Sequence, residues 1–299
     1  MIGELKYVLK CVLGKDLGGR YFTTFPDDTF IVSYPRSGNT WTRFLIGNLI
    51  QPSGPITFLN IERVIPDTSA LSKSYLKHVP RPRILKSHQY FDPRYKKVIY
   101  IVRDPRDVAL SHYNWQRKYR EIDDQYPLER YTSRFVAGDL AGWGSWGEHV
   151  LSWLATRHNS PGFLLLRYEE MHAEPIRELG KVADFLGMKA TQETLATAVE
   201  RSSADNMRKL EKVQGEKWVA TLDGLRDKGQ RSEIPFVGKA KHGGWKSLLP
   251  ESCVDEIESA WGPLMKTLGY ELARRSSPAM EPPFVHLGDW GARLNQPTC

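Results

Sequence analysis

Cysteine is scarce in this chain. The 299 residues include only three cysteines, Cys11, Cys253 and Cys299, which lie far apart, and no C-x-x-C motif occurs. Isolated cysteines argue against a disulfide scaffold and against a zinc site. They predict a reducing compartment, and we therefore expect a cytoplasmic location.

Long hydrophobic runs are also missing. No apolar run approaches the ~18 residues of a membrane-spanning helix, so the sequence predicts no transmembrane segment. Lys6 and Lys10 interrupt the stretch Met1–Leu13, which therefore lacks the apolar core of a signal peptide. We expect a short amphipathic lead-in helix there, with a peripheral membrane contact as the less favoured alternative.

The composition is that of a globular protein with a basic surface. Hydrophobic residues make up 40% and charged residues 26% of the chain, and the formal net charge is +7. This charge suits an anionic ligand, but nucleic acid and membrane surfaces attract the same charge, so it does not decide the function. We predict a single domain over residues 1–275 and a poorly ordered tail over residues 276–299, which carry Ser, Pro and Gly with little periodicity.

Short apolar runs alternate with helical periodicity along the chain. The pattern predicts strands at Thr29–Tyr34, Arg83–Lys86, Lys97–Val102 and Phe163–Arg167. Helices are expected at Thr40–Ile50, Pro105–Glu121, Trp146–His158, Pro175–Gly187, Thr191–Arg201, Ala204–Lys212 and Glu251–Leu268. Residues 117–134 and 223–241 are interpreted as a flexible excursion and a long mobile loop. The alternation predicts an α/β fold with a doubly wound central parallel sheet flanked by helices.

The end of the first predicted strand has the form of a phosphate-binding turn. Strand Thr29–Tyr34 leads through Pro35, Arg36 and the residues Ser37–Thr40 into a helix. A strand, tight loop and helix in this order direct backbone N–H groups at an anion beyond the carboxyl end of the sheet. The loop lacks the G-x-x-x-x-G-K-[ST] pattern that nucleotide kinases use for Mg-ATP. The sequence therefore predicts a phosphate-like ligand held without that machinery.

A second strand end points to the same kind of ligand. Strand Lys97–Val102 is followed by Arg103, with Asp104 placed to cap the next helix and Ser111 two turns into it. An arginine and a helix serine can converge on one phosphate group. The structural alternative is that Arg103 forms an ion pair with Asp107.

Together these segments resemble the cytosolic-type sulfotransferases. Tyr34-Pro-Arg-Ser-Gly-Asn-Thr-Trp41 resembles their 5′-phosphosulfate loop, usually Y-P-K-S-G-T-T-W, and Tyr100–Ser111 resembles their 3′-phosphate-binding strand and helix. Further matches are Phe135–Trp153 and Arg167–Pro175, in family order over roughly residues 29–250. The resemblance implies a P-loop-like nucleotide-binding core. It implies transfer of a sulfuryl group from 3′-phosphoadenosine 5′-phosphosulfate (PAPS) to an acceptor, with no metal required and PAP as the product.

The resemblance also implies which residues bind the donor nucleotide. They are Arg36, Ser37, Gly38, Asn39, Thr40, Trp41, Arg103, Ser111, Tyr168, Ser202, Lys239 and Lys241. Trp41 would stack on the adenine, although a core-facing aromatic explains it too, and Ser202 with Ser203 would equally cap the helix from Ala204. The family pattern R-K-G-x-x-G-x-W departs at Gly238, where the phosphate-binding arginine belongs, so Lys241 or Arg231 is expected to replace that charge.

The catalytic residues implied by the resemblance are His88, Lys86 and Arg36. Lys86-Ser-His88 resembles the family element K-T-H, in which His88 would take the acceptor proton and Lys86 would hold the sulfonate by charge. Arg36 replaces the usual lysine, and a permanently charged guanidinium fits charge stabilisation better than proton donation. His112 is the reserve base, and the carboxylates of Glu62 and Asp67 remain open as alternatives.

The predicted function is sulfation of a small phenol or alcohol, with PAPS and the acceptor as partners and no nucleic acid. Residues 51–77, 112–131 and 223–241 are expected to form the acceptor pocket, and their aromatic side chains favour an apolar acceptor. Their arginines and lysines leave a carbohydrate or peptide acceptor as the alternative. A P-loop nucleotide kinase and a non-catalytic nucleotide-binding module are the other classes. The family's dimer motif is not preserved around Lys246–Asp255, so the oligomeric state stays open.

Overall fold

The structure is a computed structural model that describes residues 12, 16–51, 53–140, 142–219, 234–237 and 242–273. Several predictions fall outside these residues. They concern the lead-in helix apart from Val12, the C-terminal tail from residue 276, and the proposed charges at Arg231, Lys239 and Lys241.

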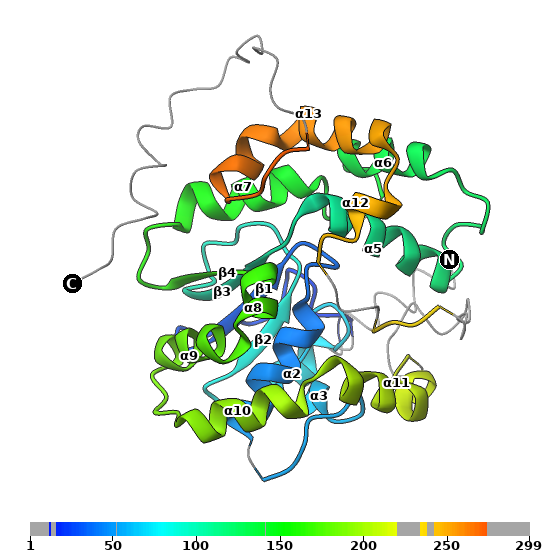
Figure 1. The fold of residues 1–299 in the computed structure, drawn as a ribbon. Helices are drawn as coiled ribbons and strands as arrows, with labels where there is room; N and C mark the ends of the chain where they lie inside the picture. The colour runs from blue at the N-terminus through cyan, green and yellow to red at the C-terminus, as the bar shows by residue number, and fades with distance from the viewer. Residues whose placement is uncertain are drawn as a thin grey trace.

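A parallel β-sheet forms the centre of the molecule (Figure 1). Its strands are β1 (Thr29–Ser33), β2 (Ile84–Ser87), β3 (Lys97–Val102) and β4 (Phe163–Arg167), in the spatial order β2-β1-β3-β4. Every neighbouring pair is parallel, and β1 and β3 are almost completely buried. Burial on both faces explains why these strands are continuous apolar runs without alternation.

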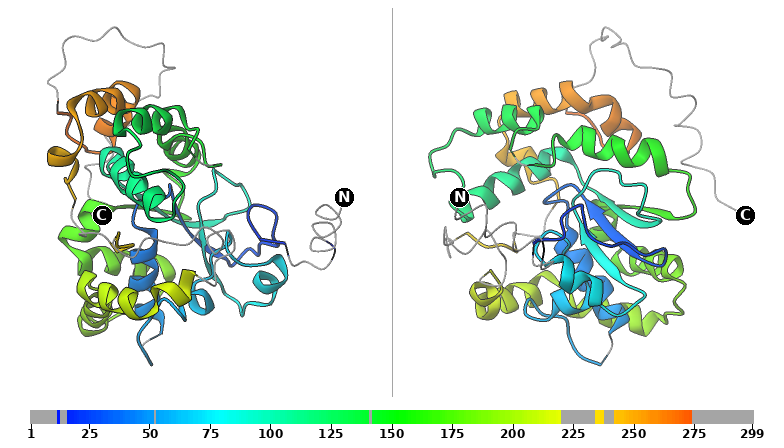
Figure 2. Two further views of the ribbon diagram at one scale, coloured as in Figure 1. Left: turned by 90° about the vertical axis from the view of Figure 1, so that its right-hand side faces the viewer. Right: turned by 180° about the vertical axis from the view of Figure 1, so that it is seen from behind.

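Helices cover both faces of the sheet, as Figures 1 and 2 show. The longer ones are α2 (Asn39–Ile50), α5 (Pro105–Lys118), α6 (Leu128–Ala137), α7 (Trp146–Arg157), α9 (Pro175–Leu186), α10 (Gln192–Arg201), α11 (Ala204–Val219) and α13 (Glu251–Thr267). The short ones are α3 (Ile61–Val64), α4 (Lys73–His78), α8 (Tyr168–Ala173) and α12 (Trp245–Leu248).

Successive strand residues supply two different cores. Phe30, Val32 and Tyr100 pack with the core that includes α7 and α13, whereas Ile31 and Ile99 pack with the core that includes α2, α9 and α10. Side chains of a strand alternate between the two faces of a sheet, so each strand serves both layers. The predicted doubly wound fold is confirmed.

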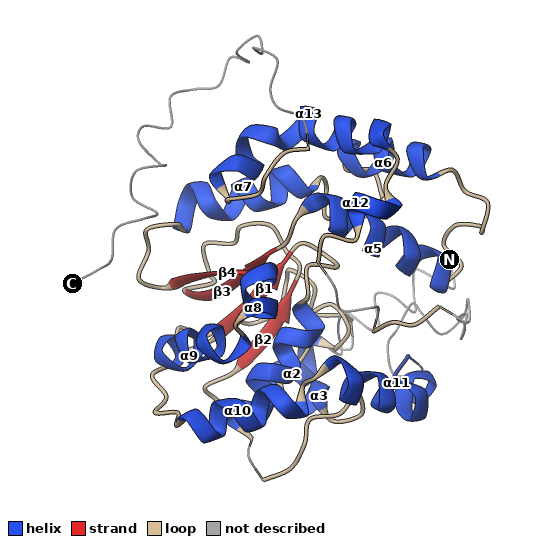
Figure 3. Cartoon of the chain, viewed as in Figure 1, coloured by secondary structure: helices blue, strands red, loops and turns tan. Residues whose placement is uncertain are grey.

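The predicted flexible excursion over residues 117–134 is wrong in its second half. Residues 128–137 form α6, which is drawn as a helix in Figure 3. This helix packs against α13, and its Tyr131 and Phe135 are completely buried. Leu128, Tyr131, Thr132 and Phe135 recur at helical spacing, and this apolar stripe explains the helix. Charged residues lie between these positions, and for this reason the sequence pattern was not interpreted as a helix.

The carboxyl ends of the strands lead into the predicted site segments. β1 ends before the loop to α2, β2 ends before His88, and β3 ends before Arg103. Within the described part of the chain, every helix is too short or too polar to cross a membrane.

Candidate active site

The loop between β1 and α2 has a backbone conformation that only some residues tolerate. Arg36 has φ of 70° and Gly38 has φ of 99°, both in the left-handed region. A Cβ atom on Gly38 would lie 2.4 Å from Cδ2 of Tyr168. Glycine is therefore required at position 38 for its positive φ and for the contact with the Tyr168 ring.

The N-terminus of α2 faces this loop without a side-chain cap. The N-cap residue is Gly38, so no described side chain at this position accepts a hydrogen bond from the first N–H groups of the helix. The first turn also contains no acidic residue. The first N–H groups of a helix lack partners within the helix, and together with the helix dipole they favour an anion. The hydroxyl of Ser37 is buried beside this turn and has no hydrogen-bond partner among the described residues.

Asn39 and Thr40 occupy the first turn of α2. The Asn39 amide donates hydrogen bonds to the Ser33 hydroxyl at 3.1 Å and to the Ile31 carbonyl at 3.4 Å. Its side chain thus anchors the helix to β1, which leaves its backbone N–H as the group available at the helix N-terminus. Thr40 is half-buried in the same turn.

Two guanidinium groups and a hydroxyl converge beside the loop. Arg36 Nε donates to the Ser111 hydroxyl at 3.2 Å, and Arg103 Nη1 donates to the Arg36 carbonyl at 3.3 Å. Burial lowers the pKa of Arg36 to about 10, and the nearby charge of Arg103 acts in the same direction. The effect of Arg103 shows that two positive charges lie close together here.

The ion pair between Arg103 and Asp107, which was the structural alternative for Arg103, is also present, but its atoms are far apart for a salt bridge. Arg103 Nη2 lies 4.0 Å from the Asp107 carboxylate. That carboxylate also accepts hydrogen bonds from the backbone N–H groups of Gly243 at 2.6 Å and Trp245 at 3.1 Å. Asp107 therefore connects Arg103 to the segment that begins α12.

Trp41 and Tyr168 form an aromatic corner next to the arginines. Their ring centroids lie 5.6 Å apart in an edge-to-face arrangement, and the Arg103 guanidinium lies 4.3 Å from the Tyr168 ring centre. The indole N–H of Trp41 donates to the Ser202 carbonyl at 3.0 Å. Trp41 remains partly exposed.

The hydroxyl of Ser202 is occupied within the protein. It donates to the Ala198 carbonyl at 2.7 Å and accepts from the Asn48 amide at 3.0 Å, and the residue is completely buried. Capping of the next helix is performed by Ser203, whose hydroxyl accepts from the backbone N–H of Asn206 at 3.4 Å. Ser202 therefore contacts the predicted nucleotide site through its carbonyl oxygen, which accepts the hydrogen bond from the Trp41 indole.

His88 directly follows β2, and its tautomer is set by a hydrogen bond. Its Nδ1 lies 2.7 Å from the Ser33 carbonyl oxygen, which can only accept, so Nδ1 carries the proton and Nε2 has the free lone pair. Burial and the neighbouring Lys86 ammonium hold the pKa of His88 well below its usual value. The Trp143 ring lies 5.7 Å from the imidazole. A neutral histidine with a fixed tautomer suits proton abstraction.

The alternative bases have other partners. Asp67 pairs with Lys86, and Glu62 lies 2.9 Å from the guanidinium of Arg43. His112 is buried, its Nδ1 lies 2.5 Å from the Tyr131 hydroxyl, and burial together with the Arg36 charge lowers its pKa to about 3. These contacts favour His88 over all three.

One contact beside Arg36 was not predicted from the sequence. The Glu211 carboxylate of α11 accepts hydrogen bonds from the backbone N–H groups of Phe236 at 2.5 Å and Val237 at 2.8 Å. The Phe236 ring thereby lies 5.0 Å from the Arg36 guanidinium. Residues 234–237 were expected within a mobile loop, but this described part is anchored. The contact joins residues 25 positions apart, so local sequence pattern cannot reveal it.

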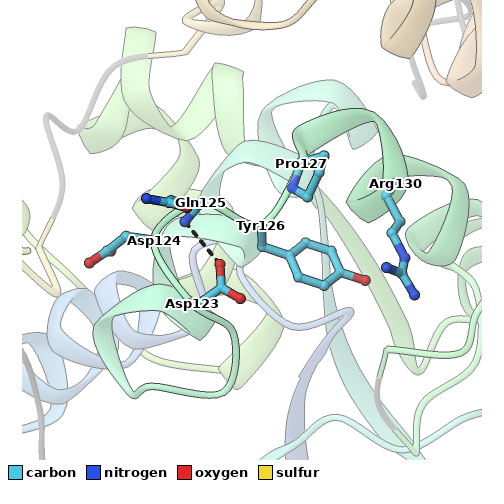
Figure 4. Close-up of a pocket in the computed structure, with 6 residues that line it drawn as sticks. All are labelled: Asp123, Asp124, Gln125, Tyr126, Pro127 and Arg130. Atoms are coloured by element: carbon cyan, nitrogen blue, oxygen red, sulfur yellow. Dashed lines mark hydrogen bonds between the residues drawn. The ribbon is translucent and has the colours of Figure 1, made fainter.

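A shallow surface pocket of about 600 Å³ lies between α5 and α6 (Figure 4). It is lined by Asp123, Asp124, Gln125, Tyr126, Pro127 and Arg130. All of these residues belong to the stretch 112–131 that was expected to contribute to the acceptor pocket, but none of the predicted donor-binding or catalytic residues lines this pocket.

Comparison with known proteins finds matches over most of the chain. A sulfotransferase domain matches residues 26–269. The chain is 33% identical to sulfotransferase 1A1 of Bos taurus over 206 residues, which cover 63% of this chain and 68% of that protein. It is 29% identical to sulfotransferase 1B1 of Mus musculus over 260 residues, which cover 80% of this chain and 83% of that protein.

Solved structures also resemble this chain in fold. Mouse sulfotransferase SULT7A1 complexed with PAP is 25% identical, with a TM-score of 0.66 and coverage of 82% of this chain and 86% of that one. Retinol dehydratase in a complex with retinol and PAP is 22% identical, with a TM-score of 0.67 and coverage of 86% and 85%. The second likeness concerns the fold alone.

Proposed function

This chain belongs to the sulfotransferase family, and from that premise we propose that it transfers a sulfuryl group from PAPS to a hydroxyl group of a small molecule. The observation that carries the proposal is the convergence of Arg36, Arg103 and Ser111 beside the uncapped N-terminus of α2. His88 stands at the end of the adjacent strand β2 with Nε2 free to accept a proton.

The residues around the loop fit the donor nucleotide. The unpartnered hydroxyl of Ser37 and the uncapped N–H groups of residues 38–40 would receive the 5′-phosphosulfate. Arg103 and Ser111 would bind the 3′-phosphate, and Trp41 with Tyr168 would receive the adenine. Lys239 lies outside the described residues, as do Lys241 and Arg231, the residues predicted to replace the charge missing at Gly238, and all three stay predictions.

The chemistry follows from charge and position. When bound, PAPS supplies an activated sulfuryl group on a phosphate leaving group. His88 would take the acceptor proton at Nε2 as the hydroxyl oxygen attacks. Arg36 would stabilise the negative charge that develops on the departing phosphate, because with a pKa of about 10 it stays charged at neutral pH. Lys86 would balance charge on the transferring group.

The proposed acceptor is a phenol or alcohol. Aromatic side chains stand at both reacting ends, with Trp143 5.7 Å from His88 and Phe236 5.0 Å from Arg36. Apolar and aromatic walls favour an apolar hydroxyl compound over a sugar, and a carbohydrate or peptide acceptor remains the second candidate. The cytoplasmic location expected from the sparse cysteines stays a prediction.

A sulfation screen tests this function. The protein is incubated with ³⁵S-labelled PAPS and pooled phenols, alcohols, sugars and tyrosine peptides, and labelled products are separated. We expect transfer to a phenol or alcohol, and loss of transfer in His88→Ala with nucleotide binding retained. Transfer to sugars or peptides alone would move the proposal to the second candidate. If single-turnover reactions show neither sulfation nor PAPS hydrolysis, the chain is a non-catalytic binding module.

A further inference from the structure

We propose that Asp67 is a positioning residue of this active site, which holds Lys86 in place and thereby controls the charge beside His88. This inference rests on the proposed sulfuryl transfer. It assigns a function to a carboxylate that the pattern of the catalytic element Lys86-Ser-His88 does not include.

The backbone brings Asp67 alongside Lys86. The Lys86 N–H donates to the Pro66 carbonyl at 2.8 Å, and the Thr68 N–H donates to the Lys86 carbonyl at 3.0 Å. These two bonds form a parallel bridge between Asp67 and Lys86 on the outer edge of β2. Residues paired in this way project their side chains to the same face, so the bridge sets the ion pair between the Asp67 carboxylate and the Lys86 ammonium.

The Asp67 carboxylate is fixed before any ligand arrives. Its Oδ1 accepts from the Ser69 N–H at 2.8 Å, and the Asp67 N–H donates to the Glu62 carboxylate at 2.8 Å. Glu62 in turn lies 2.9 Å from the buried guanidinium of Arg43. Side chains of Asp67 and Lys86 are only 10% and 13% exposed, so water screens the pair weakly.

The charge of this pair acts on His88. Lys86 and His88 are two positions apart along an extended chain and therefore share a face. The charged and titratable groups that face His88 are Lys86 and Asp67 beside β2 and His149 from α7, whose Nε2 lies 3.1 Å from the His88 carbonyl. The Lys86 ammonium lowers the pKa of His88 and the Asp67 carboxylate raises it. Asp67 thus offsets Lys86 and preserves the basicity of His88.

Asp67 itself is poorly placed to act as the base. The Lys86 ammonium and the Arg43 guanidinium hold its pKa at about 2, so it is a weak proton acceptor at neutral pH. The carboxylate therefore acts through its neighbours.

The test compares Asp67→Asn with the unmodified protein in two measurements. In the pH profile of kcat/KM, the unopposed Lys86 charge should move the acid limb to lower pH by about one unit and reduce the plateau about tenfold. Asp67→Glu should restore most of both values. In the double variant Asp67→Asn/Lys86→Met both charges are gone, so the limb should return towards its original pH although the plateau stays low.

The second measurement does not require activity. Reductive methylation followed by peptide mass spectrometry reports the access of Lys86, which the ion pair restricts. We expect Asp67→Asn to increase labelling of Lys86 several-fold and to leave the control residue Lys77 unchanged. Failure to sulfate any acceptor, with this labelling change present, would reject the proposed function and keep the positioning role.

The matched control is Asp28→Asn. Asp28 and Arg83 form a completely buried ion pair at the opposite, amino ends of β1 and β2. This variant should lower the melting temperature without moving the acid limb. If Asp67→Asn behaves like Asp28→Asn, with the limb unmoved and Lys86 no more reactive, Asp67 is a structural residue and the proposal is overturned.

Discussion

The donor half and the acceptor half of this site handle charge in opposite ways. Around the loop from β1 to α2, Arg36 and Arg103 converge beside an uncapped helix N-terminus and an unpartnered Ser37 hydroxyl. Around β2, Lys86 is neutralised by Asp67 and His88 is fixed by a backbone carbonyl. In the first half a bound anion would balance the positive charge, whereas in the second half the charge of Lys86 is already paired with Asp67.

This difference separates binding from proton transfer. Excess positive charge raises the affinity for a nucleotide with several phosphates, and bound anion should in turn stabilise the fold. In the acceptor half, burial keeps the base neutral and the Ser33 carbonyl keeps it oriented, whether or not the nucleotide is present. Substitutions in the two halves should therefore have distinct signatures.

The largest expected effect comes from the acceptor half. His88→Ala removes the proposed base, and we expect kcat to fall about 10³-fold, within the range for loss of a general base. Affinity for PAP, measured by isothermal titration calorimetry, should stay within about twofold because no phosphate contact is lost. An active His88→Ala enzyme would show that the base lies elsewhere, and His112→Gln is the variant to examine next.

In the donor half, Arg36→Met should weaken both functions. Loss of one buried cation that stabilises the developing charge is expected to cost about 10²-fold in kcat and a further loss in PAP affinity. Arg36→Lys should recover part of kcat because a lysine keeps the charge. Arg177→Met, at an exposed arginine of α9, is the control and should change neither value. Equal PAP affinity in Arg36→Met and the unmodified protein would remove Arg36 from the anion site.

Much of the fold and of the donor half could be predicted from the sequence, because these features depend on residues that are neighbours along the chain. Strand, turn and helix follow from apolar runs and turn residues, and all the predicted strands are present with shifts of one residue at most. The convergence of Arg36, Arg103 and Ser111 follows from placing two strand ends at one edge of a parallel sheet.

Contacts between segments that are distant in the sequence could not be predicted in this way. The Glu211 carboxylate holds Phe236 near Arg36. The bridge between Asp67 and Lys86 forms at an edge strand, and no turn residue or periodicity in the sequence predicts it. Ser202 illustrates the reverse case, because its motif suggested a nucleotide contact while its hydroxyl bonds Ala198 and Asn48. Tertiary packing decides which side-chain atoms remain free.

Gly38→Ala is expected to affect the donor half selectively and more mildly. The added Cβ would lie 2.4 Å from the Tyr168 ring, and the alanine backbone would have to adopt a φ of 99°. The loop must therefore shift. We expect a loss of about 2 kcal/mol in unfolding free energy and about tenfold weaker PAP binding. Chemical denaturation and calorimetry measure both. Gly54→Ala, at a glycine with open space around it, is the control and should leave PAP binding unchanged.

The smallest effect expected is that of mild acid on the acceptor half, and its direction is fixed by the His88 environment. A histidine with the ordinary pKa of 6.5 would be about three-quarters protonated at pH 6.0, and kcat/KM would fall about fourfold from its plateau. Burial and Lys86 hold the pKa of His88 well below that value, and only the neutral ring can accept a proton. Activity should therefore change by less than about twofold between pH 7.5 and pH 6.0, in a buffer of constant ionic strength. A fourfold loss by pH 6.0 would mean that the base ionises like an exposed histidine and that burial beside Lys86 does not keep it neutral.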